Sequence, residues 1–70
     1  MSINQHERLV VRRGRLYLLN VNEFTRKPNW TPSPYDAWWT RTEADAEAVA
    51  GKVDGVTVVF NPIVGKVGMN

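Results

Sequence analysis

The stretch between Trp38 and Ala50 limits the possible folds of this 70-residue chain more than any other segment. An aromatic pair there runs directly into an alanine-rich sequence with the periodicity of a helix. Apolar residues recur three, four and seven positions after the first one, which is the spacing of a single buried helix face; they are Ala46, Val49, Ala50 and Val53. We therefore expect one helix with a narrow buried stripe, preceded by a short aromatic strand.

The start of this helix has two alternative registers. With Thr42 as the N-cap, its hydroxyl accepts a hydrogen bond from a backbone N–H of the first turn, and Asp45 falls at position N3. With Thr40 as the cap, Glu43 falls at N3. We favour Thr42 because that register agrees with the apolar stripe. In both registers Glu43, Asp45 and Glu47 lie near the positive end of the helix dipole, so a structural role explains their charge better than catalysis does.

The remaining regular segments read as strands. Alternating or continuous apolar residues predict strands at residues 8–12, 15–21 and 56–60, and residues 36–40 form a fourth, shorter one. Asp54-Gly55 provides a left-handed stop between the helix and the last of these strands.

Residues 25–35 form a proline-rich segment. Pro28, Pro32 and Pro34 fix their φ angles and lack a backbone N–H, so we expect a stiff loop there. Residues 63–70 are interrupted by glycine, and we expect them either to fray or to add an edge strand. Residues 1–7 are expected to form a flexible arm.

The order of these elements is strand, strand, loop, strand, helix, strand. It predicts a single α+β domain over residues 1–70, in which a small antiparallel sheet carries one helix on one face. Both faces of the strand at residues 15–21 are apolar. We therefore also consider a homodimer that buries the face away from the helix.

The chain lacks the side-chain sets that catalytic and metal sites need. It contains no cysteine and one histidine, His6, in a polar amino-terminal segment. No nucleophile with a neighbouring base and no metal-ligand spacing is visible. Glu43, Asp45 and Glu47, at successive steps of two, are expected to spread around the helix instead of converging. We expect a protein that is not an enzyme, with no cofactor and no metal.

Hydropathy and charge limit the expected cellular location and the expected class of ligand. No apolar run approaches the ~20 residues that cross a bilayer, and the amino terminus lacks a signal-peptide core, so we expect a cytoplasmic protein without membrane contact. The formal net charge is +2, with seven basic and three acidic side chains in residues 1–41 and two basic and four acidic ones after them. This dipolar distribution argues against a mimic of DNA and favours a polyanionic ligand only weakly.

Taken together, these residues resemble a group of small, mostly uncharacterised α+β proteins encoded by phages and prophages. The resemblance covers residues 8 to 60, and it rests on Gly14, Leu16, Tyr17, Leu18, Trp30, Ala37, Trp38, Thr40, Thr42, Glu43, Asp45, Ala46 and Glu47. The doubled Trp38-Trp39 and the proline-rich segment depart from the pattern. The resemblance implies a short accessory protein in the cytoplasm of a host cell, which binds and modulates or inhibits a host or defence factor.

Aromatic and basic side chains around the proline-rich segment are the main functional candidates. Adjacent strand residues point to opposite faces, so one helix covers one of Trp38 and Trp39 more easily than the other. The second indole is either capped by the Trp30 segment or left exposed as an anchor, since Trp, Tyr and Arg are enriched at binding hot spots. The predicted protein-binding set is Trp30, Tyr35, Trp38, Trp39, Arg26, Lys27 and Arg41.

A single-stranded nucleic acid is the alternative partner. Its bases would stack on the same rings while Arg12, Arg13 and Arg15 contact phosphates. These arginines also fit a solvated hairpin tip that prevents edge-to-edge association of sheets. The low net charge and the acidic helix favour a protein partner over a nucleic acid.

Overall fold

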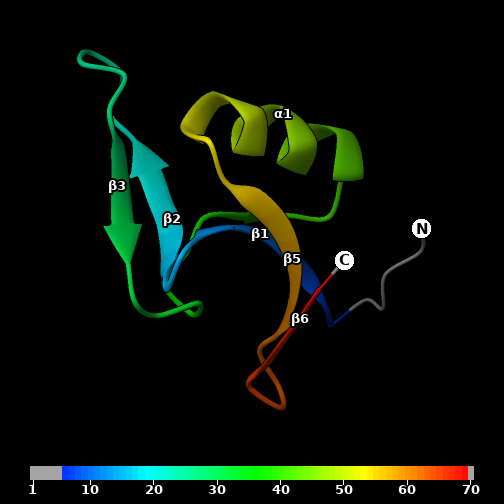
Figure 1. Cartoon of the computed structure of the whole chain (residues 1–70). Coiled ribbons are helices and arrows are strands. Elements are labelled where there is room, and N and C mark those ends of the chain that lie inside the picture. Colours follow the sequence, from blue (N-terminus) through cyan, green and yellow to red (C-terminus); the bar gives the residue numbers. More distant parts are fainter. Residues whose placement is uncertain (1–5, 70) are drawn as a thin grey trace.

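One helix lies against a six-stranded antiparallel sheet in the computed structural model, which describes residues 6–69 (Figure 1). The α+β class is therefore confirmed. In chain order the elements are β1 (Arg8–Arg13), β2 (Leu16–Val21), β3 (Pro28–Thr31), β4 (Trp39–Thr40), α1 (Glu43–Val53), β5 (Val56–Asn61) and β6 (Lys66–Met69). The structure adds β3 to the expected order, and it has an edge strand, β6, in the segment where either fraying or an edge strand was expected. Within residues 6–69, no helix combines the length and the apolar character needed to cross a bilayer.

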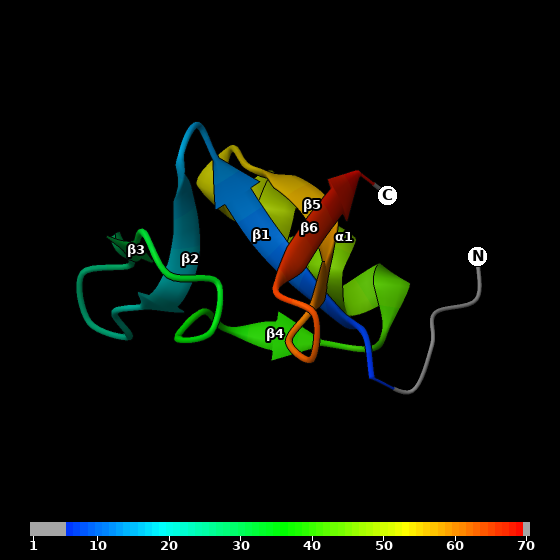
Figure 2. The ribbon, with the colours of Figure 1, turned by 90° about the horizontal axis from the view of Figure 1, so that it is seen from below.

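Strand β1 is the hub of the sheet, because it pairs with three other strands. The main path runs β3-β2-β1-β5-β6, and β5 pairs along β1 from Arg8 to Arg12. The opposite edge of β1 is divided: its last residues pair with β2, and Leu9 and Val10 pair with β4. Figure 2 shows β2 and β4 leaving β1 in different directions. The Trp38 N–H donates to the Leu18 carbonyl oxygen (2.8 Å), which ties the start of β4 to β2.

The expectation of a continuous loop at residues 25–35 is wrong for the four residues of β3. Pro28 is the first residue of this strand and faces Val21 of β2. Because β3 is the edge of the sheet, the missing proline N–H leaves no neighbouring strand without a donor. Pro32 and Pro34 follow the strand, where they no longer oppose pairing.

A register shift in β2 decides which side chains reach the helix. Leu18 faces Trp30, but Asn20 faces Asn29, so the extra residue in β2 is Leu19. Such a bulge reverses the alternation of side chains after it. Val21 consequently points to the helix side, where it lines an apolar groove with Val49 and Val53.

Helix α1 begins after Thr42, so the favoured register is confirmed. The hydroxyl of Thr42 makes no cap hydrogen bond, however, and that part of the prediction is wrong. The Thr42 carbonyl oxygen accepts from the Ala46 N–H (3.1 Å), and the Thr42 N–H donates to Thr40 Oγ1 (3.1 Å). At the other end Asp54 is left-handed (φ 58°), and the Gly55 N–H donates to the Ala50 carbonyl oxygen (2.9 Å).

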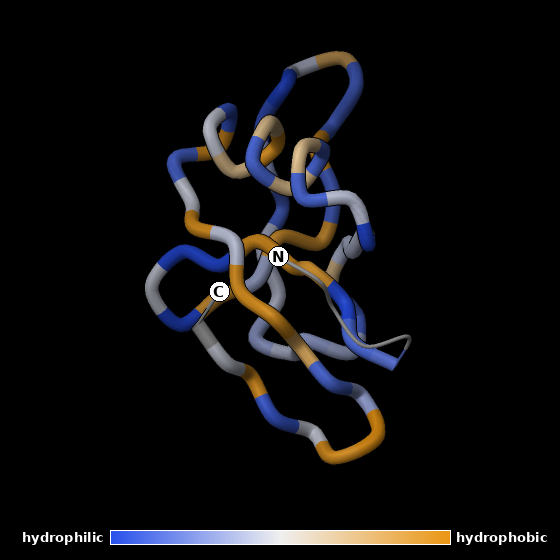
Figure 3. Tube along the Cα trace, turned by 90° about the vertical axis from the view of Figure 1, so that its right-hand side faces the viewer, coloured by the Kyte–Doolittle hydropathy of each residue, from blue (hydrophilic) through white to orange (hydrophobic). Residues whose placement is uncertain are grey.

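Buried side chains cover both faces of the sheet. The cluster on the helix side contains Val11, Leu18, Ala50 and Val53, with Trp30, Trp38 and Val49 packed against it. The cluster on the other side contains Val10, Ala37, Val58 and Phe60, with Tyr17 and Val67 packed against it. Figure 3 shows hydrophobic segments of the trace passing through the middle of the fold. A second hydrophobic segment lies at the tip of the β5–β6 hairpin, where Ile63 and Val64 are exposed.

The chain passes from α1 to β5 through a tight contact. A Cβ at Gly55 would lie 2.7 Å from Val11 Cγ1 and 3.1 Å from the Arg12 carbonyl oxygen. Only glycine allows β5 to begin this close to β1 directly below the end of the helix.

Candidate functional site

The structure divides the predicted binding set between the two faces of the sheet. Trp30 and Trp38 are half-buried and pack against the helix-side cluster. Trp39 pairs with Val10 and therefore shares the face of the opposite cluster. The seven residues do not form one continuous patch around the proline-rich segment, and Trp39 is the most exposed indole, at 40%.

Two guanidinium groups lie over the Trp39 ring. The Cζ of Arg8 lies 4.6 Å from the ring centroid and the Cζ of Arg41 lies 5.2 Å from it, both within cation–π range. Each contact of this kind contributes about 0.5–1 kcal/mol at an exposed site. We refer to Arg8, Trp39 and Arg41 as the Trp39 patch. Sequence analysis did not include Arg8, because only the pairing of β1 with β4 brings it next to Trp39.

Tyr35 lies on the same side of the sheet as the Trp39 patch. Its ring meets Phe60 edge-on, with centroids 4.9 Å apart and planes at 87°, and Phe60 faces Arg8 across β1 and β5. A Cβ at Gly65 would lie 2.9 Å from the Tyr35 hydroxyl oxygen, so the β5–β6 turn approaches the phenol closely. Although 56% exposed, Tyr35 is thus held by its ring contact with the core.

Arg26 and Lys27 lie in the turn between β2 and β3, away from Trp39 in the chain fold. The Asn22 side-chain oxygen accepts from the N–H groups of Phe24 and Thr25 (2.9 and 3.0 Å), which shapes the turn, and Arg26 has a positive φ of 61°. Arg26 lines the apolar groove between β2 and the helix, which has a volume of about 520 Å³. Lys27 is exposed.

The arginines of the alternative nucleic-acid site lie at the turn between β1 and β2. Arg12 Nε donates to the Gly14 carbonyl oxygen (2.8 Å), and Gly14 has a φ of 63° that suits a tight turn. Arg13 and Arg15 are exposed. Arg12 therefore stabilises the turn, and the other two extend from its tip.

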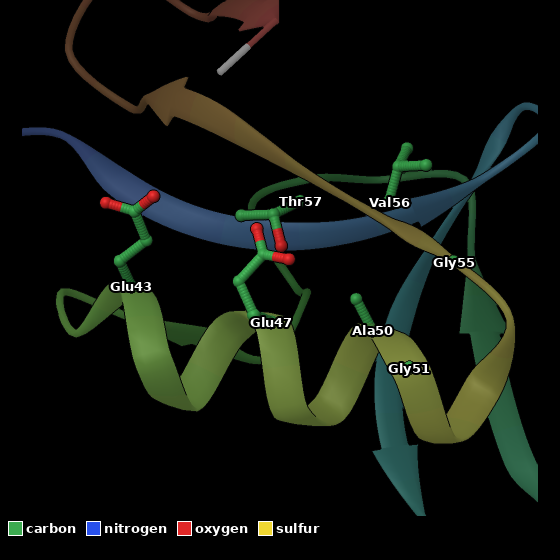
Figure 4. Close-up of a pocket in the computed structure, with 7 residues that line it drawn as sticks. All are labelled: Glu43, Glu47, Ala50, Gly51, Gly55, Val56 and Thr57. Atoms are coloured by element: carbon green, nitrogen blue, oxygen red, sulfur yellow. The ribbon is translucent and has the colours of Figure 1, made fainter. Parts of the chain in front are cut away.

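A second cavity, which sequence analysis did not anticipate, lies between α1 and β5 (Figure 4). It has a volume of about 570 Å³, and its lining residues are Glu43, Glu47, Ala50, Gly51, Gly55, Val56 and Thr57. The expectation that the acidic side chains spread around the helix is wrong for Glu43 and Glu47, which are four residues apart and share one face. The signal in the sequence was the spacing of four residues from Glu43 to Glu47 and again from Glu47 to Gly51.

Thr57 contributes a buried hydroxyl to this cavity. The residue is only 8% exposed, and its Oγ1 has no hydrogen-bond partner within the described part of the chain. An unsatisfied buried hydroxyl costs about 1–3 kcal/mol, so this atom stands out among the polar groups of the fold.

Metal-ligating side chains do not converge in the described residues. Across residues 6–69, no group of three or more His, Cys, Asp or Glu side chains is arranged to hold a metal ion. What the arrangement offers is binding chemistry: a cationic aromatic patch on one side and an acidic cavity on the other.

Comparison with known proteins adds no relative. No protein-family model matches the chain, and neither the curated proteins nor the solved structures contain a match.

Proposed function

We propose that this chain is a non-catalytic binding protein whose Trp39 patch docks an acidic segment of a protein partner. The observation that carries the proposal is the exposed indole of Trp39, with the guanidinium groups of Arg8 and Arg41 over its ring. In the phage setting that the sequence resemblance implies, the partner would be a host or defence factor that the protein modulates or inhibits.

The chemistry of the patch suits a carboxylate-rich surface. The Arg8 guanidinium carries N–H donors in a planar fork, and such donors match a carboxylate in bidentate geometry. The indole adds a large apolar area that a partner can bury. Because the ring orders both guanidinium groups before binding, less side-chain entropy is lost when the complex forms.

Charge distribution favours a protein over a nucleic acid. The formal net charge is only +2, and Arg12, which shares the sheet face of Arg8, is bonded to its own turn. Arg12 is four residue steps along the strand from Arg8, about 13 Å at the usual rise of a strand. A single-stranded nucleic acid that contacts both arginines would have to span that distance. It is the competing partner in the experiments below.

The first experiment compares partner capture by matched variants. Purified protein is immobilised on a resin and incubated with a lysate of the natural host. A captured protein is identified by mass spectrometry, then purified and titrated against each variant. We expect Trp39→Ala and Arg8→Lys each to weaken the purified complex about tenfold or more, as hot-spot and bidentate sites do. Phe24→Ala, which removes a 93% exposed ring from the β2–β3 turn, is the control and should bind normally.

Unchanged affinity of the Trp39→Ala variant, with its circular dichroism spectrum intact, would refute the proposed surface. The nucleic-acid alternative is tested by fluorescence anisotropy with single- and double-stranded oligonucleotides over a range of salt concentrations. Binding that weakens steeply with salt would favour it over the protein partner, because phosphate contacts release counterions.

A further inference from the structure

We infer that the cavity between α1 and β5 binds the cationic side chain of a basic peptide residue, with Glu43 and Glu47 facing the cation and Thr57 accepting a hydrogen bond from it. This site shares no residue with the Trp39 patch and is opposite to it in charge. It does not depend on the function proposed above.

The two carboxylates provide the charge. Glu43 and Glu47 lie one helical turn apart on α1, and both line the cavity (Figure 4). In Figure 4 the Glu47 carboxylate points toward Thr57 on β5, so a cation that enters there would meet both groups. A guanidinium or ammonium group also supplies the N–H donors that carboxylates accept most strongly.

Thr57 provides the second, independent indication of a ligand. Its side chain belongs to the cavity wall and its hydroxyl oxygen is buried, without a hydrogen-bond partner in residues 6–69. Buried hydroxyls are nearly always paired in folded proteins. A ligand N–H that enters between the two carboxylates would give Thr57 the missing partner.

The floor of the cavity is made of residues with little or no side chain. Ala50, Gly51 and Gly55 lie there, and a Cβ built at Gly51 would have nothing within 4 Å. With a volume of about 570 Å³, the cavity has room for the long stem of arginine or lysine. Such stems pack against apolar atoms while the charged end stays among polar groups.

The edge of β5 beside this cavity is suited to a peptide backbone. Pairing between β5 and β6 ends with Val58 and Met69, so Val56 and Thr57 have no strand partner on that side in residues 6–69. Extended peptides add to free sheet edges by main-chain hydrogen bonds, and pockets beside the edge select their side chains. A peptide that pairs with Val56 and Thr57 would thereby deliver one basic side chain to Glu43 and Glu47.

The test uses the whole chain, isotope-labelled, and amide chemical shifts read by NMR. The probe is a short extended peptide with one central arginine among serines and valines, blocked at both ends. We expect it to shift the Gly51, Gly55 and Thr57 amides, and a peptide with citrulline in place of arginine to bind at least about tenfold more weakly, since it lacks the charge. Equal binding of the citrulline peptide would overturn the proposal.

Three variants locate the site. Glu47→Gln and Thr57→Val should each weaken binding of the arginine peptide, by about tenfold and about threefold respectively, because the first removes a charged acceptor and the second a neutral one. Asp45→Asn makes the same charge change on a part of the helix outside the cavity and should leave binding unchanged. Thr57→Val removes an unpaired hydroxyl at constant shape, so loss of binding cannot be attributed to unfolding if thermal stability is retained or increased.

Two further titrations separate the occupant from its competitors. Blocked free arginine that binds as tightly as the peptide would assign the cavity to a small cationic molecule and overturn the peptide assignment. Mg²⁺ or Ca²⁺ alone, if either reproduced the same shifts with the same dependence on Glu47, would assign it to a metal ion instead. Both titrations are independent of Trp39 and Arg8, so their outcome is separable from that of the proposed function.

Discussion

Trp38 and Trp39 are neighbours in sequence but occupy different surroundings. Trp38 packs against the cluster under the helix, where Val49 and Trp30 also lie, and is half-buried. Trp39 lies on the opposite face, 40% exposed, with two arginines over its ring. The difference shows that a helix on one side of the sheet covers that side alone, while hairpins and two tyrosines close the other side incompletely.

The two faces also differ in how they are covered. On the helix side the cover is a regular element with small buried residues, Ala46 and Ala50, so the helix approaches the sheet closely. On the far side the cover consists of side chains from Tyr17, Tyr35 and Val67. The far face thus has both a core and an exposed indole. Four predictions test the two faces and the chain segments that connect them.

Truncating the core of either face should give the largest effect. Phe60→Ala on the far face is expected to lower the free energy of unfolding by about 3–5 kcal/mol, and Leu18→Ala on the helix side by about 2–5 kcal/mol. Both residues are at most 1% exposed. Urea denaturation measures the loss, with exposed Phe24→Ala as the control. A small loss for Phe60→Ala alone would show that the far face holds no real core.

The two neighbouring indoles should differ in stability and in access to solvent. Trp38→Ala should cost about 2–3 kcal/mol, somewhat less than a fully buried aromatic ring, and Trp39→Ala about 1 kcal/mol through its arginine contacts. Trp39→Phe should also remove most of the tryptophan fluorescence that acrylamide quenches. If Trp38→Phe had that effect instead, the assignment of the two faces would be reversed.

Two glycines at the end of the helix should respond in opposite directions. Gly55→Ala is expected to destabilise the fold by about 1–3 kcal/mol, because its Cβ would press on Val11 and the Arg12 carbonyl. Gly51→Ala meets no atom within 4 Å and should stabilise the helix by about 0.5–1 kcal/mol. Thermal melts of the two variants check this, and equal shifts would contradict the close approach of β5 to β1.

The smallest expected effect lies at the junction where the chain passes from β4 into α1. Thr42→Ala should cost only a few tenths of a kcal/mol, below the typical ~1 kcal/mol for an N-cap threonine, because its hydroxyl makes no cap bond. Thr40→Val should cost about 0.5–1.5 kcal/mol, since its hydroxyl accepts from the Thr42 N–H. The reverse order in urea denaturation would show that Thr42 caps the helix in solution.

The sequence was sufficient for elements whose local signals agree with their packing. The apolar stripe and the stop at Asp54 located α1, and three strands lie close to their expected ranges. The proline-rich pattern predicted a loop where β3 forms. Whether proline disrupts a strand depends on whether that strand is central or at an edge of the sheet. That position is set by the whole sheet and cannot be read from Pro28 itself.

The candidate sites were predictable to a smaller extent. Opposite orientations for Trp38 and Trp39 follow from strand geometry, but the division of the β1 edge between β2 and β4 is a tertiary feature, and it alone brings Arg8 to Trp39. Likewise, the step from Glu43 to Glu47 is visible in the sequence. The unsatisfied hydroxyl of Thr57 opposite them becomes visible only when β5 is placed under the helix.

The three-way pairing of β1 has a consequence for biosynthesis. A ribosome releases β1 and β2 first, and they can close as a hairpin, but the long partner of β1 is β5, which is translated much later. Until then one side of the nascent hairpin is open to pairing with another chain. Folding of this protein is therefore governed by late, non-local contacts, and truncated translation products ending before Val56 should aggregate rather than fold.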